Sequence, residues 1–331
     1  MENEPLSKPS TAPAMHRFAI LLACVTFLLL FVGALVMSTG SGLSVPTWPL
    51  AWGKLIPPLV GGVRYEYAHR VIAGLVVVLT LTMAVWAVMA ERRRIVRNTA
   101  IAAFALVIVQ ALLGGLTVLL GIPLPIAMAH TSTAIIFFCT AVALAIFTGR
   151  WFEEAPHLEE PPHRLALTTL GVITTLVVYC QIVIGSVVRF VNDAIAIRDF
   201  PIFAGPAVPG VMSEAVLSDY VHLGGAIAVT FFVLWTSLRV FRSHLDQPRL
   251  VRLAEAMVLL LALQILLGLT TVWSDGAVIP ASAHVAVGAA VLATSVAMTL
   301  CAFRLYGRPR RAPQGASREP LRGTFERKVT A

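Results

Sequence analysis

The chain has 331 residues, of which 58% are hydrophobic and only 13% charged, and its formal net charge is +8. Soluble domains carry about 25% charged residues, so this composition excludes an ordinary soluble protein and indicates an integral membrane protein. No folded basic domain accounts for the positive charge. We therefore expect the lipid bilayer as a partner and no nucleic acid.

Eight segments are apolar enough and long enough to span a membrane, which requires about 20 predominantly apolar residues. They cover residues 17–38, 66–90, 99–120, 125–148, 165–190, 218–241, 250–273 and 278–304. The first segment is long for the apolar part of a signal peptide and lacks a convincing cleavage site after it. We therefore expect eight transmembrane helices, with the first one retained.

The distribution of basic residues predicts the orientation. Most of the 25 Lys and Arg residues lie before the first segment, in alternate loops and after the last segment. By the positive-inside rule both termini are then cytoplasmic, in a multi-pass protein of the plasma (inner) membrane. The polar tail 308–331 is expected to be disordered. The opposite, outer side holds five basic residues, namely Lys54, Arg64, Arg70, Arg189 and Arg198.

Four histidines lie near the start of alternate predicted helices, the second, fourth, sixth and eighth. His69 follows Glu66 in the stretch EYAHR, and the others are His130 in AHTSTA, His222 in YVHLGGA and His284 in SAHVAVGA. These four helices run from the outer side inward, so all four imidazoles should lie at similar depth near the outer surface. Ionisable residues inside a membrane are costly and indicate a functional site.

The two halves of the chain resemble each other. QALLGGLTVLLGIPLPIAMAH, from Gln110 to His130, matches QILLGLTTVWSDGAVIPASAH, from Gln264 to His284. An even number of helices in each repeat makes the repeats parallel, with an axis along the membrane normal. We predict an all-α integral membrane fold of two tandem four-helix bundles related by pseudo-two-fold symmetry.

We place the N-terminal half at 1–160, the C-terminal half at 161–307 and the tail at 308–331. The polar link 149–164 is the expected joint. Small residues permit close approach of membrane helices; the candidates are Gly114, Gly115, Gly224, Gly225 and Gly268. The remaining histidines are expected to be solvated, and they are His16, His157, His163 and His244.

Four histidines at one depth admit three interpretations. The first is hydrogen bonding between helices. A zinc or copper site is the second, although zinc prefers mixed shells and no cysteine lies near an outer helix end. Haem is favoured, because two imidazoles on facing helices can ligate one iron from both sides inside a four-helix bundle. The expected pairs are His69 with His130 and His222 with His284, one haem in each half.

Each haem also needs cations for its propionates, and Arg suits carboxylates. The candidates are Arg64, Arg70, Arg189 and Arg198. Glu66 lies one helical turn before His69, where a carboxylate beside a haem edge can act as a base or stabilise a cation. Asp219 has the same place before His222, and a helix N-cap is its more ordinary interpretation. The first half is thus the candidate for chemistry and the second for electron transfer.

At this point the chain resembles the haem A synthase family, over nearly its whole length. The motifs are SGLSVPTWPL, GGVRYEYAHR, QALLGGLTV, AHTSTA, VHLGGA, QILLGLTTV and AHVAVG. The resemblance implies an oxidoreductase that converts the C8 methyl of haem O to the formyl group of haem A for cytochrome oxidases. It implies that His69 and His130 flank the substrate haem O and that Glu66 is the essential glutamate. It also implies a resident haem b held by His222 and His284.

Two features of the first outer loop depart from the family pattern. Val45 and Ala51 stand near where many relatives have a cysteine pair, so no disulfide can form there. Thr47 stands where the loop often has an aspartate, which puts any role of that carboxylate in doubt.

Two routes to the product are compatible with the residues. In one, electrons are withdrawn from the haem, and Glu66 takes a proton from the C8 carbon or stabilises positive charge there before water adds. In the other, one histidine dissociates and oxygen reacts at the iron. The alternatives to a synthase are a dihaem b-type membrane electron-transfer protein, which has no need of Glu66, and a haem transporter or chaperone. Further expected partners are haem O synthase (protohaem farnesyltransferase) and an unidentified electron donor, with a homo-oligomer left open.

Overall fold

A computed structural model of the chain describes residues 12–191 and 213–307, and this part consists of helices joined by loops, without strands. Eight of its helices are long and apolar enough to cross a membrane, so the predicted multi-pass membrane protein is confirmed. A ninth, α5 (Arg150–Glu154), is short and lies in the predicted link. The long helices are α1 (Ala12–Ser38), α2 (Val63–Ala90), α3 (Arg94–Leu119), α4 (Leu124–Thr148), α6 (Leu167–Val191), α7 (Glu214–Ser243), α8 (Pro248–Trp273) and α9 (Val278–Tyr306).

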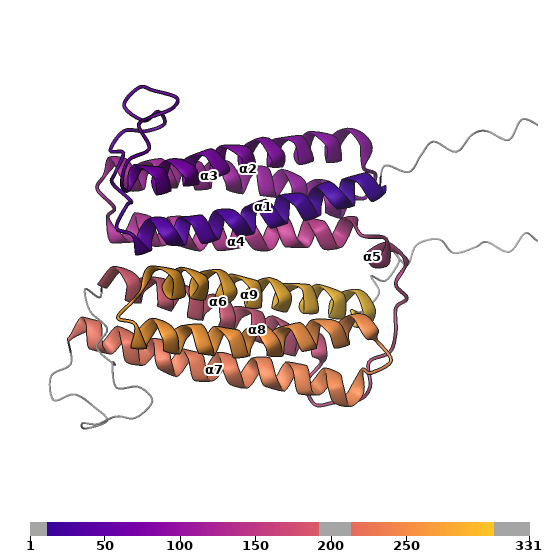
Figure 1. Cartoon of the computed structure of the whole chain (residues 1–331). Coiled ribbons are helices and arrows are strands. Elements are labelled where there is room, and N and C mark those ends of the chain that lie inside the picture. The colour runs from indigo at the N-terminus through magenta and orange to yellow at the C-terminus, as the bar shows by residue number, and fades with distance from the viewer. Residues whose placement is uncertain (1–11, 192–212, 308–331) are drawn as a thin grey trace, which may run out of the picture.

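The long helices form two groups of four, α1 to α4 and α6 to α9 (Figure 1). In the first group α1 packs beside α2 and α4, and α3 also packs beside α2 and α4. The second group has the same order, with α6 and α8 each beside α7 and α9. Consequently α2 lies diagonally opposite α4, and α7 diagonally opposite α9. These are the four helices that carry the predicted histidines.

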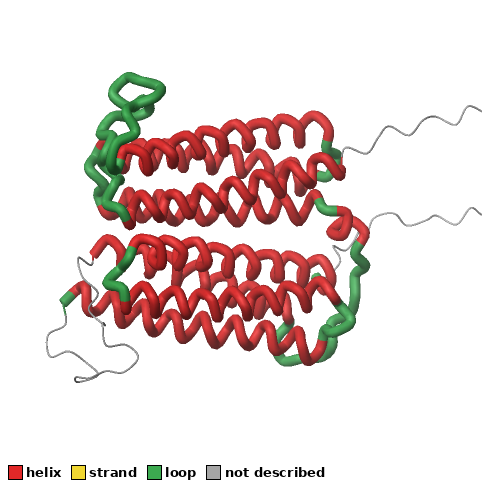
Figure 2. Tube along the Cα trace, in the orientation of Figure 1, coloured by secondary structure: helices red, strands yellow, loops and turns green. Residues whose placement is uncertain are grey.

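The two groups meet through α9, which packs against α1 and α4, and through α4 against α6. Both described chain ends lie at one end of the molecule, and the loop between α1 and α2 projects from the other (Figures 1 and 2). We call these the terminal end and the histidine end, because the histidines lie in the first turns of their helices at the latter. They are His69, His130, His222 and His284.

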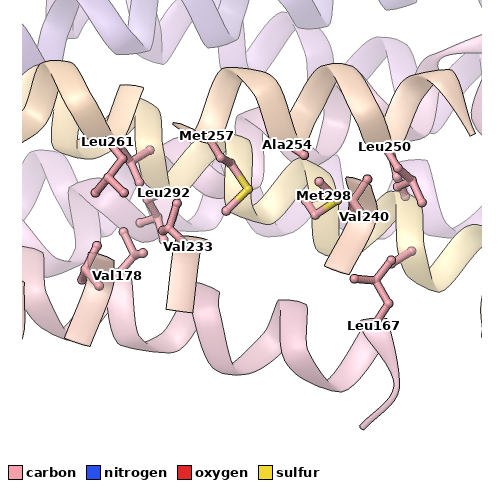
Figure 3. Packing of buried hydrophobic residues seen from close by; sticks show 14 of the residues in the cluster. Leu167, Val178, Val233, Val240, Leu250, Ala254, Met257, Leu261, Leu292 and Met298 are labelled. Atoms are coloured by element: carbon pink, nitrogen blue, oxygen red, sulfur yellow. The ribbon is translucent and has the colours of Figure 1, made fainter. Parts of the chain in front are cut away.

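Apolar cores fill the interior of each group on the terminal side of the histidines. In the first group Met83 and Leu144 are fully buried, and in the second Val233, Met257 and Leu292 are buried together (Figure 3). Lipid tails are as apolar as these side chains, so tight packing rather than escape from water holds the helices together. Because each core lies further along its helix than the histidine, the polar site is confined to one end.

The link after α4 is tied to the second group by hydrogen bonds. Arg304 near the end of α9 donates from Nη2 to the carbonyl of Glu153 at 3.0 Å. The Leu158 amide donates to the carbonyl of Leu305 at 2.7 Å. Glu160 pairs with Arg239 of α7 at 3.0 Å. The segment after α5 therefore belongs structurally to the second group of helices.

The prediction that His244 is solvated is wrong. The residue caps the end of α7, is fully buried, and its Nδ1 lies 2.9 Å from the Tyr306 hydroxyl. Sequence suggested a solvated loop because His244 stands among polar residues, whereas the returning end of α9 covers it. His157 and His163 are exposed as predicted, and His16 is half-buried with Nδ1 3.3 Å from the Thr148 hydroxyl.

Candidate histidine site

Each of the four histidines places its ring against a glycine of the long helix that precedes it. A Cβ atom built on Gly33 would lie 3.0 Å from Cε1 of His69. Real Cβ atoms rarely approach so closely, so a larger residue would displace the ring. The other three contacts have the same geometry, with Cβ to Cε1 distances of 2.9 Å for Gly114 and His130, 2.7 Å for Gly185 and His222, and 3.1 Å for Gly268 and His284.

These contacts show a different structural role for some of the glycines from the one that the sequence predicts. Gly114 and Gly268 were expected to let helix backbones approach, but what they admit is an imidazole ring. Gly115 admits the indole of Trp48, and Gly225 the amide of Gln181, whereas Gly224 faces open space. The glycines therefore shape the side-chain site as much as the helix packing.

The second group brings His222 and His284 together. Their ring centroids are 6.3 Å apart and their planes differ by 67°. Gln181 of α6 donates from Nε2 to the carbonyl of His222 at 2.8 Å and lies 3.0 Å from its Nδ1. Gln264 of α8 has its amide nitrogen 3.2 Å from Nε2 of His284. Two amides thus orient the two imidazoles.

The first group repeats this arrangement on one side only. Gln110 has its amide nitrogen 3.3 Å from Nε2 of His130, like its counterpart in the second group. Beside His69, however, Leu29 occupies the place in α1 that Gln181 has in α6. Among the described atoms, Nδ1 of His69 and Nδ1 of His130 are buried without a hydrogen-bond partner. The first pair is thus less constrained by neighbouring polar groups than the second.

Glu66 is buried beside His69, with 3% of its surface exposed, and both carboxylate oxygens accept hydrogen bonds. Oε1 accepts from Nη2 of Arg70 at 2.5 Å, and Oε2 accepts from the Val45 amide at 2.8 Å. Arg70 also donates to the carbonyls of Val45 and Thr47, at 2.8 and 2.7 Å. The ion pair therefore fastens the outer loop to α2 and fixes the direction of the carboxylate.

The outer loop 39–62 covers the histidine end of the first group. The Thr47 hydroxyl donates to the Leu50 carbonyl at 2.7 Å and accepts from the Trp52 amide at 2.7 Å. Trp48 lies against Gly115 of α3, where a Cβ would come 2.7 Å from the indole. Thr47 thus closes the turn that presents Trp48 to the bundle, next to the glycine that accommodates His130.

The arginines considered for propionates lie in different surroundings. Arg64 is exposed and donates to the neighbouring Tyr65 hydroxyl at 3.1 Å. Arg189 of α6 reaches across to α1, where it donates to the Ala34 carbonyl at 3.2 Å and to the Ser38 hydroxyl at 2.7 Å. Arg198 lies outside the described residues. The propionate role of all four arginines stays a prediction.

The second group lacks a copy of the Glu66–Arg70 pair. Asp219 is buried, but Leu223 occupies the position that corresponds to Arg70. The N-cap interpretation of Asp219 is wrong, because α7 begins at Glu214 and Ser213 accepts from the Val216 amide at 3.3 Å as the cap. The helix starts before the apolar run, since polar residues form its first turn at the membrane surface.

The donor chemistry fits haem. Within residues 12–191 and 213–307, no three or more His, Cys, Asp or Glu side chains are placed to hold a metal ion by themselves. Two imidazoles from diagonal helices instead match the two axial positions of a haem iron, and the unpartnered buried nitrogens of His69 and His130 suit such a ligand. Which residues bind haem stays a prediction.

The fold and the site define a multi-pass helical membrane protein with half-buried histidine pairs on diagonal helices. Residues 63–296 match the sequence model of the COX15-CtaA family, described as cytochrome oxidase assembly protein. The chain belongs to this family, which confirms the resemblance seen in its motifs.

Curated relatives cover most of the chain. The heme A synthase of Shouchella clausii is 30% identical over 243 residues, 69% of this chain and 78% of that protein. The heme A synthase of Halalkalibacterium halodurans is 29% identical over 307 residues, 87% of this chain and 96% of that protein. The heme A synthase of Bacillus pumilus is 26% identical over 278 residues, 82% of this chain and 89% of that protein.

Proposed function

We propose that this chain is a haem A synthase, an oxidoreductase that converts the C8 methyl of haem O into the formyl group of haem A. The observation that carries the proposal is the asymmetry of the two histidine pairs. Glu66, held by Arg70 and the outer loop, stands beside the first pair only. An electron carrier with two equivalent haems needs no such carboxylate, and relatives named heme A synthase match across most of the chain.

We assign the two sites to the two halves. His69 and His130, within 1–160, would hold the iron of the substrate haem O, and His222 with His284, within 161–307, would hold a resident haem b. The recurring glycine–histidine contacts and the matching order of helices support two tandem bundles related by a pseudo-two-fold axis. A haem b so held would supply one-electron transfer chemistry to the protein.

The chain's own residues have distinct roles in the oxidation. Converting a methyl to a formyl group with water removes four electrons, which an external electron acceptor must take up, and four protons. Positive charge must therefore be stabilised and protons accepted near the C8 carbon. Glu66 can do either, and its ion pair with Arg70 and hydrogen bond from the Val45 amide favour a fixed anion near the substrate. Arg70 holds this orientation, and the loop carrying Trp48 covers the site from the outer aqueous phase.

The proposed orientation follows from charge. Basic residues gather at the terminal end, so both termini face the cytoplasm and the histidine end faces outward from the plasma membrane. Haem O is apolar apart from its propionates and would enter from the bilayer, supplied by a haem O synthase. The candidates for its propionates remain Arg64, Arg70, Arg189 and Arg198.

The decisive experiment is the extraction and mass identification of haems from membranes that co-express the chain with a haem O synthase. We expect haem A together with its hydroxymethyl precursor. Glu66→Gln should abolish both products yet keep the resident haem spectrum, whereas the matched change in the other half, Asp219→Asn, should retain product. If the native chain, supplied with oxygen and a competent redox partner, leaves haem O unchanged and contains only haem b, the dihaem electron-transfer protein would be favoured.

A further inference from the structure

A cavity with a strongly basic lining lies at the terminal end, remote from the histidines. Its volume is about 280 Å³, and it opens where α1 begins, where α4 passes into α5 and where α8 begins. Three arginines are among the residues that line it, namely Arg17, Arg150 and Arg249. The first two belong to the first group of helices and its link, and Arg249 belongs to the second group. The cavity is therefore located at the seam between the halves.

No carboxylate balances these charges within the described residues. The lining contains no Asp or Glu, and none of the three arginines forms an ion pair with a described side chain. Arg93, at the same end of the molecule, is by contrast neutralised by ion pairs, with Glu91 at 2.8 Å and Glu153 at 3.3 Å. Three like charges around one cavity repel each other, and an anion in the cavity would remove this cost.

Two of the lining side chains are held in place before any ligand arrives. The Arg249 guanidinium lies 4.5 Å above the centre of the Trp151 ring, a cation–π contact that leaves its N–H donors available. His16 is oriented by the Thr148 hydroxyl, 3.3 Å from its Nδ1. A site whose groups are already ordered loses less conformational entropy on binding.

The position of the cavity specifies the kind of anion. The lining residues lie at or just beyond the ends of helices that are long and apolar enough to span a membrane, where lipid headgroups would meet water. Guanidinium groups bind phosphate oxygens in bidentate geometry, and basic pockets between helices on the cytoplasmic side bind anionic headgroups. We propose that Arg17, Arg150 and Arg249 bind one phosphate group, that of an anionic phospholipid, and that it joins the two halves at the terminal end.

The test compares two triple variants of the full-length chain, purified and delipidated in detergent. R17Q/R150Q/R249Q removes the lining charges. R92Q/R94Q/R242Q removes the same charge from exposed arginines at the same end that do not line the cavity. Binding of phosphatidylglycerol and of phosphatidylcholine with identical acyl chains is measured by native mass spectrometry. Each lining arginine should contribute about fivefold to phosphatidylglycerol affinity, so the cavity variant should lose roughly a hundredfold.

Competition with inorganic phosphate against chloride at equal ionic strength separates the two sources of the same chemistry. The competition measures how readily bound phosphatidylglycerol is displaced. Displacement only by added phosphatidylglycerol supports a lipid ligand. Displacement by inorganic phosphate at low millimolar concentration supports a phosphate site filled from the cytoplasm. Equal binding of the two lipids, or equal losses in both triple variants, would overturn the proposal. If the cavity variant does not fold, the same loss of phosphatidylglycerol affinity is tested with the single variant R249Q, and R242Q is its control.

Discussion

The Glu66 carboxylate accepts one hydrogen bond from its own helix and one from a loop more than twenty residues earlier in the chain. Arg70 is the residue that makes this arrangement stable, because it binds the carboxylate and two loop carbonyls at once. A buried charge that loses its partner is strongly destabilising, by about 3–5 kcal/mol. Arg70 is therefore a positioning residue for Glu66 whatever its relation to a propionate.

Replacing Arg70 should impair chemistry and local structure together. For Arg70→Gln we expect haem A formation to fall at least tenfold and the apparent melting temperature to drop, while the resident haem spectrum persists. Haem extraction and thermal unfolding measure the two effects. Lys54→Gln removes an exposed charge from the same outer loop and should change neither. A normal product yield from Arg70→Gln would show that Glu66 needs no positioning.

The glycines opposite the histidines lead to a second prediction at the scale of single residues. Gly185→Ala places a methyl group 2.7 Å from Cε1 of His222, so the ring must move and the bis-imidazole spectrum of the resident haem should be lost. Gly224→Ala is the control, because nothing lies within 4 Å of its Cβ and alanine is the better helix former. An unchanged haem spectrum in Gly185→Ala would contradict the assignment of His222 as a ligand.

At the scale of elements, the ends of the helices make tertiary contacts that the apolar pattern of the helices does not predict. The end of α7, the link after α5 and the end of α9 meet around His244, which is fully buried. Burial lowers the pKa of His244 from its ordinary value of 6.5. Arg239 and His163 lower it further, while Glu160 and Asp246 oppose the shift.

The sign of the resulting pH dependence follows from the lowered pKa. The unfolded chain binds a proton at His244 as the pH falls through about 6.5, whereas the folded chain does not, so the free energy of unfolding decreases on acidification. We expect the apparent melting temperature to fall between pH 7.5 and 5.5, and to fall less in His244→Gln. Parallel pH profiles of the two proteins would contradict this prediction, because they would mean that the pKa of His244 is the same in the folded and unfolded states. His157→Gln, an exposed histidine of the link, is the matched control.

At the scale of the whole molecule, two similar four-helix groups are joined side by side, and we propose that one binds substrate and the other transfers electrons. The contacts between them include α9 against α1 and α4, α4 against α6, and the hydrogen bonds of Arg189 to α1. The two histidine pairs belong to different groups, so each should bind its haem without the other.

Separate sites predict separable losses. His222→Ala should lose the resident haem spectrum and stop haem A formation, because electrons cannot leave the substrate, yet haem O should still be recovered with the purified protein. His130→Ala should show the reverse, with the resident haem present and bound haem O lost. Quantifying each haem by mass in the two purified variants tests this. Loss of both haems in either variant would mean that the sites are coupled.

The eight helices, their order and the alternate positions of the four histidines could all be predicted from the amino-acid sequence. These features depend on apolar length and on motif repetition, which are local properties of the chain. Other features became visible only in the folded molecule. Val45 and Arg70 hold Glu66, and Gln181 orients His222 while Leu29 stands beside His69. His244 is buried, and arginines of both halves share one cavity. Such contacts join residues far apart in the chain, and no local periodicity records which side chains a folded backbone brings together.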